Sequence, residues 1–246
     1  MPHRLHVDLP LREGDEVALP GGAARHVQVL RLQPGAAVVL FDGQGGEWAA
    51  QVTHMGRSEV RVSIGAHVAV DRELACAVTL AFGMPANERM DALIEKACEL
   101  GVATIQPLLC ERSVLRLTGE RAEKKVAHWR GVAVAACEQS GRTRLPWIAP
   151  VRTLPGWLAA LPPPDGARLL LSPRAAQPLP RAADFRALTA LSGPEGGLSD
   201  AEEAAARSRG FVAVSLGPRV LRADTAPLAL LAHLALANAQ EGFDPA

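Results

Sequence analysis

The sequence has only four cysteines among its 246 residues, and no two of them have CxxC spacing. That spacing argues against a structural zinc site and against the disulfide framework of a small secreted protein. The seven histidines show neither HxxxH nor HExxH spacing, so zinc ligation by histidine is not expected either. We therefore expect no bound metal, and buried free thiols in a reducing compartment. The cysteines are Cys76, Cys98, Cys110 and Cys137.

Long apolar runs and an excess of charge are also missing. No run of about 18 apolar residues occurs and the N-terminus lacks a secretory signal, so we expect a soluble cytoplasmic protein with no membrane segment. The 26 Lys and Arg residues balance 26 Asp and Glu residues, so the overall charge does not indicate a nucleic-acid binder. Between residues 108 and 152, however, nine basic residues stand against four acidic ones. This local surplus is typical of a phosphate-binding patch, and equally of a solvated helix face.

Three common catalytic motifs are absent as well. The sequence contains no GxGxxG, no P-loop with its Lys-Ser/Thr pair, and no GxSxG. Their absence argues against a dinucleotide-dependent oxidoreductase, a triphosphate site and a serine hydrolase.

The first 70 or so residues predict a small β domain. Short runs with partial alternation, separated by turns rich in glycine and proline, are typical of the strands of a small barrel. A short helix is expected at residues 23–32. The pattern changes near residues 70–73, so we predict two domains, residues 1–72 and 73–246. The expected strands cover residues 17–19, 37–41, 48–52 and 60–64.

From Cys76 onward, strands and helices alternate, which predicts an α/β domain with a mostly parallel sheet covered on both faces. Residues 76–82 form an apolar run typical of a buried strand. Asn87 is expected to cap a helix with apolar residues at i, i+3, i+4 and i+7, which ends at Gly101. Further strands are expected at residues 102–109, 168–171, 188–191 and 211–216, and further helices at residues 119–139 and 225–239.

Three loops that follow these strands have an unusual sequence. Open α/β sheets bind ligands at the carboxyl ends of their strands, so these loops are the candidate site. The glycines and proline of the second loop allow a tight turn and a close approach of ligand to backbone, and a capping box, Ser199-Asp200-Ala201-Glu202, then opens a helix. A neutral or cationic ligand suits such a loop better than a triphosphate. The loops are residues 171–175, 191–199 and 216–222.

The second and third loops read LSGPEGGLS and LGPRVLR, and they resemble those of the ribosomal RNA small subunit methyltransferase E family, within the SPOUT superfamily of knotted methyltransferases. The resemblance extends over nearly the whole chain. It includes the segments KACELGV at residues 96–102, QPL at 106–108, ERS at 111–113, EQSGR at 138–142, His26 with Val29-Leu30-Arg31, and Phe41-Asp42-Gly43.

The resemblance implies a trefoil-knotted SPOUT methyltransferase domain preceded by a small PUA-like β-barrel that binds RNA. It also implies a homodimer that transfers a methyl group from S-adenosyl-L-methionine to N3 of a uridine in the 16S rRNA of the small ribosomal subunit. The cofactor would lie on the three loops, at Leu171, Ser172, Leu191, Gly193, Pro194, Glu195, Gly196, Gly197, Leu216, Gly217, Val220 and Leu221. For Glu195 we favour a structural role, in which its carboxylate satisfies backbone donors.

Methyl transfer of this kind requires a positioned sulfonium, an in-line nucleophile and no metal. Because uridine N3 must lose its proton, the site needs a base or a cation that stabilises the uracil anion. Arg222, at the end of the third loop, is the candidate for the cation. Asp224 could orient Arg222, accept the proton, or cap the helix that starts at Thr225. The family usually carries Glu at the position of Asp224.

For RNA, Arg142 and Arg144 follow the end of a long helix and are expected to bind phosphates, with a surface salt bridge as the alternative. Arg25, His26 and Arg31 would contribute from the barrel. A hypothesis of another class is a non-catalytic RNA-binding or ribosome-assembly factor that retains the methyltransferase fold. Binding of S-adenosylmethionine distinguishes the two.

Overall fold

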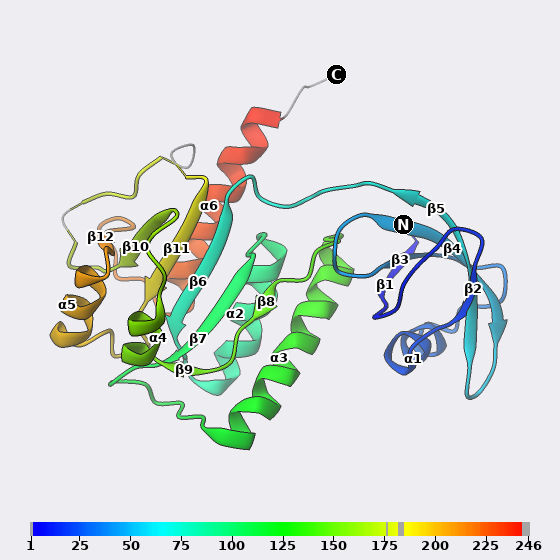
Figure 1. Ribbon diagram of the computed structural model, residues 1–246, viewed down its shortest axis with the longest axis horizontal. Coiled ribbons are helices and arrows are strands. Elements are labelled where there is room, and N and C mark those ends of the chain that lie inside the picture. Colours follow the sequence, from blue (N-terminus) through cyan, green and yellow to red (C-terminus); the bar gives the residue numbers. More distant parts are fainter. Residues whose placement is uncertain (1, 176, 182–184, 243–246) are drawn as a thin grey trace. The chain divides into compact units, whose positions relative to one another are not determined.

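The computed structural model describes residues 2–175, 177–181 and 185–242, apart from the side chains of residues 87, 88 and 238–242. The chain forms two compact units (Figure 1). The first consists of residues 1–73 together with 134–145, and the second of residues 74–133 and 146–246. The segment 134–145 lies inside the sequence of the second unit, so it departs from the single boundary expected after residue 72.

The first unit is built on a five-stranded sheet in the order β1-β3-β4-β5-β2. The β1–β3 pair is parallel and the other pairs are antiparallel. Alternate residues of the strands point into one apolar core, which includes Leu5, Leu40 and Val62. The strands are β1 (His3–His6), β2 (Glu16–Ala18), β3 (Ala37–Phe41), β4 (Glu47–Met55) and β5 (Val60–Val68).

The helix of this unit, α1 (Gly21–Val29), is shifted from the predicted range of residues 23–32. It buries Ala23, Ala24 and Val27. Arg31 lies beyond its end with a φ of 54°, in the left-handed region that terminates a helix. Arg31 is therefore an exposed loop residue, as Arg25 is an exposed residue of α1.

Backbone and side-chain hydrogen bonds join residues 134–145 to the first sheet. Gly45 N donates to Thr143 O at 3.1 Å, and Leu145 N donates to Gly43 O at 3.0 Å. The Glu138 carboxylate accepts a hydrogen bond from the backbone N–H of His6 at 2.9 Å and lies 3.4 Å from His26 Nδ1. His26 thus has an acidic partner within its own unit.

Arg142 is not available to RNA phosphates, and our prediction for this residue is wrong. Its side chain is 4% exposed and forms an ion pair with Glu73, in which Nε donates to Oε1 at 3.0 Å. The backbone carbonyl of Arg142 accepts a further hydrogen bond from Arg4. Arg142 therefore holds residues 134–145 to the end of the first segment, whereas Arg144, two residues on, is exposed.

Arg142→Ala should lower the free energy of unfolding by about 3 kcal/mol, because the Glu73 carboxylate would remain largely buried without its partner. Urea denaturation monitored by circular dichroism measures the effect. Arg144→Ala, which removes an exposed charge two residues away, is the matched control and should leave stability within about 0.5 kcal/mol. Equal stability of the two variants would contradict a structural role for Arg142.

The second unit contains a sheet in the order β12-β10-β11-β6-β7-β8, and all of its pairs are parallel. A further short strand, β9, also pairs with β7. The parallel sheet confirms the α/β prediction for this part of the chain. Its strands are β6 (Ala77–Gly83), β7 (Thr104–Leu109), β8 (Trp147–Ile148), β9 (Arg152–Thr153), β10 (Ala167–Leu171), β11 (Ala187–Ser192) and β12 (Val212–Val214).

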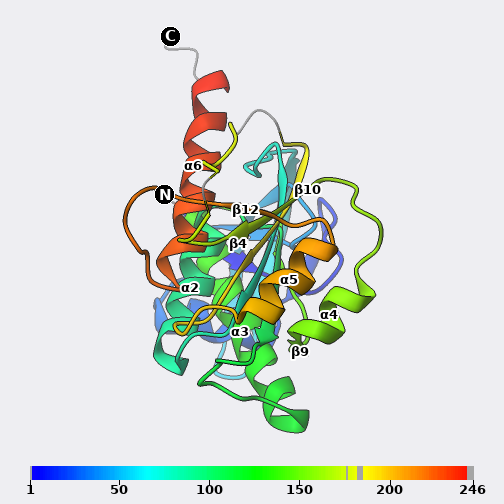
Figure 2. The ribbon, with the colours of Figure 1, turned by 90° about the vertical axis from the view of Figure 1, so that its left-hand side faces the viewer.

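Helices cover both faces of this sheet. Figure 2 shows α2 (Asn87–Glu99) and α6 (Thr225–Gly242) on one side, and α4 (Leu154–Ala160) and α5 (Asp200–Ser208) on the other. Trp157 of α4 and Ala206 of α5 pack in a core with Leu170 and Leu191 of the sheet. The long helix α3 (Gly119–Ser140) lies between β7 and β8 in the sequence.

Most elements of the second unit lie within two or three residues of their predicted ranges, whereas β8, β9 and α4 were not predicted. Gly101 ends α2 as expected, with a φ of 88°. The predicted capping box is present at α5, where Ser199 and Glu202 exchange hydrogen bonds between side chain and backbone.

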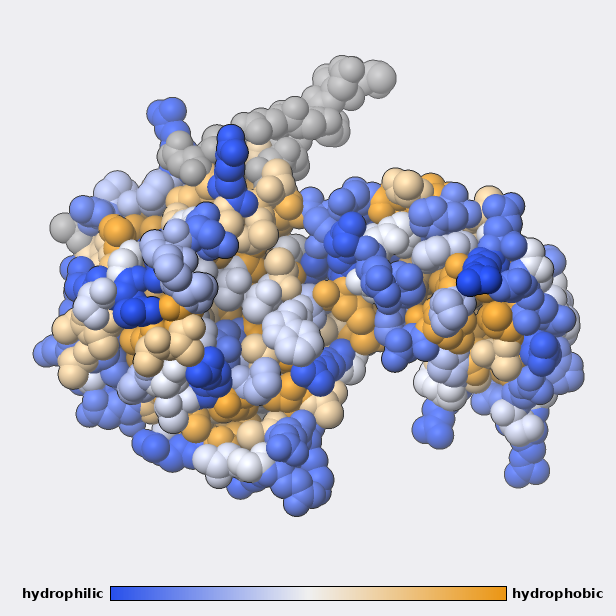
Figure 3. All heavy atoms as spheres, viewed as in Figure 1, coloured by the Kyte–Doolittle hydropathy of each residue, from blue (hydrophilic) through white to orange (hydrophobic). Residues whose placement is uncertain are grey.

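The surface of each unit mixes polar and apolar residues on the face visible in Figure 3. Among the residues that the structure describes, no helix is both long enough and apolar enough to cross a membrane.

Candidate active site

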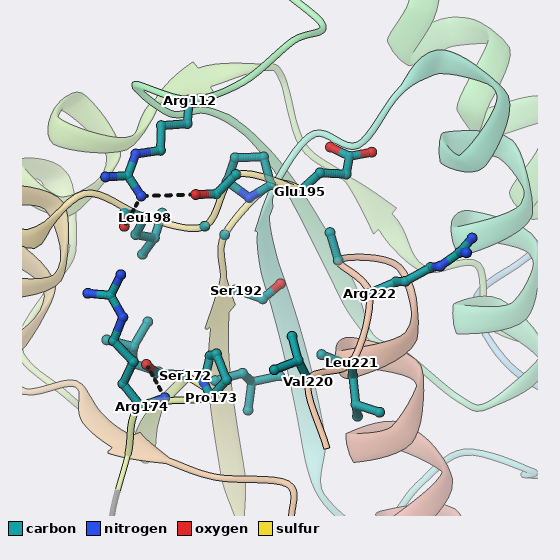
Figure 4. Close-up of a pocket in the computed structure, with 18 of the residues that line it drawn as sticks. Arg112, Ser172, Pro173, Arg174, Ser192, Glu195, Leu198, Val220, Leu221 and Arg222 are labelled. Carbon is teal, nitrogen blue, oxygen red and sulfur yellow. Dashed lines mark hydrogen bonds between the residues drawn. The ribbon is translucent and has the colours of Figure 1, made fainter. Parts of the chain in front are cut away.

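The carboxyl ends of β10, β11 and β12 meet at one edge of the sheet because these three strands are parallel neighbours. The loops that follow them enclose a pocket of about 620 Å³ (Figure 4). This volume lies within the range of roughly 300–1,000 Å³ found for small-molecule and cofactor sites. The pocket therefore lies at the edge of the sheet where the sequence predicts the site.

Most residues predicted to bind the cofactor line this pocket. They are Leu171, Ser172, Gly193, Pro194, Glu195, Gly196, Gly197, Val220 and Leu221. Leu216 and Gly217 line a smaller adjoining cavity that shares Leu171, Ser172 and Leu221 with the pocket.

Leu191 is the exception. Its side chain is fully buried in the core beneath α4 and α5 and is not part of the pocket lining, so this side chain packs the core. Successive side chains along a strand point to opposite faces, and the next residue, Ser192, lines the pocket instead. The resemblance alone did not single out Ser192.

The second loop approaches the neighbouring backbone so closely that its glycines are required. A Cβ on Gly193 would lie 2.7 Å from Leu198 N and 2.8 Å from Gly197 C. A Cβ on Gly83, at the end of β6, would lie 2.4 Å from Pro194 Cδ. Gly197, with a φ of 69°, closes a turn in which its N–H donates to Pro194 O at 2.8 Å.

Hydrogen bonds between side chains and backbone hold this loop in place. Arg112 Nη1 donates to the carbonyl of Gly196 at 3.0 Å and lies 3.4 Å from that of Leu198 (Figure 4). The Glu195 carboxylate accepts a hydrogen bond from Ala86 N at 2.9 Å, as expected for a residue that satisfies backbone donors. The segment containing Arg112 is itself fixed, because Glu111 N donates to the Glu202 carboxylate at 2.8 Å.

The polar side chains of the first loop are also paired within the chain. Ser172 Oγ donates to the Glu203 carboxylate at 3.3 Å and accepts a hydrogen bond from Arg174 N at the same distance. Arg174 forms an exposed ion pair with Asp200 at 3.1 Å.

Of the two predicted catalytic residues, only Arg222 lines the pocket. Arg222 is exposed and lines the pocket, and Figure 4 shows its side chain extending from the third loop. Asp224 is not among the lining residues. Its carboxylate accepts a hydrogen bond from the Thr225 hydroxyl at 3.5 Å, at the first residue of α6. That position fits the helix-capping alternative for Asp224.

Four arginines and two carboxylates line the pocket, so its mouth is positively charged. Arg89 lies 3.9 Å from Glu195, and the other cations are Arg112, Arg174 and Arg222. Such a concentration of guanidinium groups suits a polyanionic substrate, although the chain as a whole is neutral.

The cysteine near this site is not poised for chemistry. Burial, reinforced by the Glu202 carboxylate, raises the pKa of Cys110 to about 12. Cys110 therefore remains a neutral thiol. Within the part of the chain that the structure describes, no three His, Cys, Asp or Glu side chains come together to hold a metal ion.

The pocket fits S-adenosylmethionine in the chemistry of its lining. Apolar side chains of Leu171, Leu198, Val220 and Leu221 surround exposed loop backbone, which is suited to an adenosine group. The hydroxyl of Ser192 is buried at this site and has no hydrogen-bond partner among the residues described. A ligand that brings hydrogen-bonding groups would satisfy it.

Comparisons with known proteins agree with this fold. Residues 72–235 match the family model of an RNA methyltransferase domain, and residues 19–65 match that of an RNA methyltransferase PUA domain. The fold and pocket thus define an RNA methyltransferase with an α/β catalytic domain and a PUA-like domain.

Curated relatives are similar to this chain over most of its length. Ribosomal RNA small subunit methyltransferase E of Synechocystis is 35% identical over 84% of this chain and 68% of its own length. The Bacillus subtilis protein of the same name is 28% identical over 91% of both chains. The chain belongs to the ribosomal RNA small subunit methyltransferase E family.

Two solved structures extend the comparison to the cofactor. The enzyme of this name from Neisseria gonorrhoeae, bound to S-adenosylmethionine, is 35% identical, with a TM-score of 0.87 over 94% of this chain and 96% of that one. A putative methyltransferase from Legionella pneumophila, also with bound S-adenosylmethionine, is 31% identical, with a TM-score of 0.87 over 96% and 98%. These structures confirm the prediction of a family that uses this cofactor.

Gly193→Ala should weaken S-adenosylmethionine binding by at least about tenfold, because the added methyl group would collide with backbone and displace the loop. Isothermal titration calorimetry measures the affinity. Gly131→Ala in α3, where a Cβ would meet nothing within 4 Å, is the matched control. It should leave binding unchanged and stabilise the protein by about 0.5–1 kcal/mol. Wild-type affinity in Gly193→Ala would show that the close approach is unimportant for binding.

Arg112→Ala should weaken S-adenosylmethionine binding by about tenfold through loss of the hydrogen bonds that hold the second loop, and Arg112→Lys should recover part of it. Arg116→Ala removes the same charge from a side chain that donates to Glu111 O, and should bind normally. If Arg112→Ala bound the cofactor normally but raised the KM for RNA, Arg112 would be a substrate contact instead.

Proposed function

We propose that this chain transfers the methyl group of S-adenosylmethionine to N3 of a uridine in the 16S rRNA of the small ribosomal subunit. One observation carries the proposal, namely that the two characteristic glycine loops line a single pocket with Arg222 at its edge. The names of the relatives in Synechocystis and Bacillus subtilis support rRNA of the small subunit as the substrate.

The cofactor supplies an electrophilic methyl group on a positively charged sulfur. The chain contributes position and electrostatics. The backbone of residues 193–197 and the apolar side chains of the third loop hold and orient the ligand and exclude water from it. Arg222 stabilises the negative charge that develops on the uracil ring as N3 loses its proton. Asp224 supports Arg222 by fixing the start of α6, and it is the acidic group of this segment that could accept the N3 proton.

For RNA binding, we propose the exposed side chains of Arg25, Arg31 and Arg144 in the first unit, together with His26, which follows Arg25 in the sequence. His26 is 41% exposed and can still donate to a phosphate. Arg89 and Arg222 would add phosphate contacts at the mouth of the pocket.

The finer features implied by the family are part of the same proposal. A trefoil knot is supported by the path of the chain after β12, which returns past the ends of β10 and β11 to α6, where it packs on β11 and α2 (Figure 1). The homodimer is proposed because the family resemblance implies it. Action on ribosomal RNA implies a cytoplasmic location.

The test is a methylation assay with labelled S-adenosylmethionine, on naked 16S rRNA and on assembled small subunits that lack the modification. We expect 3-methyluridine, identified by mass spectrometry of nucleosides. Arg222→Ala should lower kcat by about 100-fold without weakening cofactor binding. Binding of the cofactor with no methylation of either substrate would reject the enzyme activity and favour the non-catalytic RNA-binding factor.

A further inference from the structure

Ser192 differs from four other polar side chains of the pocket. The hydroxyl of Ser172, the carboxylate of Glu195 and the guanidinium groups of Arg112 and Arg174 all have partners within the chain. Ser192 is 4% exposed, and its Oγ has no hydrogen-bond partner among the described residues. Figure 4 shows this oxygen in the middle of the pocket, directed into the space between the second and third loops.

The position of Ser192 in the sheet explains why the chain offers it no partner. It is the last residue of β11 and lies opposite Phe82 of β6 and Leu171 of β10. Both neighbours are apolar and buried, so the adjoining strands bring no hydrogen-bonding side chain to this point. A buried hydroxyl without a partner destabilises the folded protein, and such groups in native structures generally have a reason to remain.

The distribution of charged residues in the pocket indicates which part of a ligand lies next to Ser192. Arginines and carboxylates line the pocket together with Ser192, but the strand residues that flank Ser192 are uncharged. The charged amino-acid group of S-adenosylmethionine would lose its hydration at high cost beside Phe82 and Leu171. The uncharged adenosine group, with its ring nitrogens and ribose hydroxyls, carries no such penalty.

We infer that Ser192 is a cofactor-binding residue whose hydroxyl forms a hydrogen bond with the adenosine part of S-adenosylmethionine. This inference rests on the proposed function. The hydroxyl both donates and accepts, so it can pair with a ribose hydroxyl or an adenine nitrogen. Because the group is unpaired in the free protein, its removal affects binding without breaking a bond within the fold.

The experiment compares the wild-type protein with Ser192→Ala by calorimetric titration with S-adenosylmethionine, S-adenosylhomocysteine and 5′-methylthioadenosine, and by thermal denaturation without ligand. We expect Ser192→Ala to bind all three ligands about threefold to tenfold more weakly. The midpoint of thermal unfolding should stay the same or rise. Ser192→Cys, similar in size but a poor hydrogen-bonding group, should behave like the alanine variant.

Thr143→Val in the first unit is the matched control. Thr143 is fully buried and its hydroxyl donates to Val70 O at 3.3 Å, so its loss breaks a bond within the fold. The control should show a lower unfolding midpoint with unchanged affinity, which is the opposite of the result expected for Ser192→Ala.

Three results would overturn the inference while leaving the proposed function intact. They are wild-type affinity in Ser192→Ala, a lower unfolding midpoint in that variant without ligand, and weaker binding of S-adenosylmethionine with unchanged binding of 5′-methylthioadenosine. The last would place Ser192 against the methionine part. A wild-type protein that binds none of the three ligands would instead reject the proposed function, and this inference with it.

Discussion

The close approach of backbone to backbone at the end of β11 is the constraint on which the site depends. Gly193 touches the peptide of Gly197 and Leu198, and Pro194 lies against Gly83 of the adjacent strand. Because these are contacts between main-chain atoms or with a proline ring, they cannot be relieved by a change of rotamer. The loop is thereby held against the edge of the sheet. Two hydrogen bonds between side chain and backbone also hold it, one from Arg112 to the carbonyl of Gly196 and one from Ala86 N to the carboxylate of Glu195, a residue of the loop itself.

The electrostatics of the molecule are local. Positive and negative charges cancel over the whole chain, but the pocket mouth concentrates arginines, while its two carboxylates accept hydrogen bonds within the chain, Glu195 from Ala86 N and Glu203 from Ser172 Oγ. In the first unit the opposite arrangement occurs, since Arg142 and Glu73 neutralise one another in the interior. The net charge of a segment therefore does not predict a binding surface for a polyanion until each charged side chain is known to be exposed or buried.

Much of the second unit could be predicted from the sequence, because a parallel sheet leaves continuous apolar runs and its helices carry periodic faces. The loops were recognised from glycine and proline, whose backbone requirements are local. Three kinds of feature were not predictable. The two-residue strands β8 and β9 and the short helix α4 contain too few residues to show a period. The burial of Arg142 depends on a partner 69 positions away. The unpaired state of Ser192 is visible only when the neighbouring strands are known.

The helix α3 belongs to both units, since its first part lies in residues 74–133 and its last turns in residues 134–145. During synthesis, the N-terminal sheet therefore emerges from the ribosome without the segment that carries Glu138 and Arg142. The contacts of Glu138 and Arg142 with this sheet can form only after residues 74–145 have also been synthesised. Long sequence separation of this kind slows folding, because distant segments must meet before their contacts contribute. A fragment cut after residue 73 would have the strands of the first unit but not its closing segment, so the first unit cannot be produced whole as a continuous N-terminal fragment.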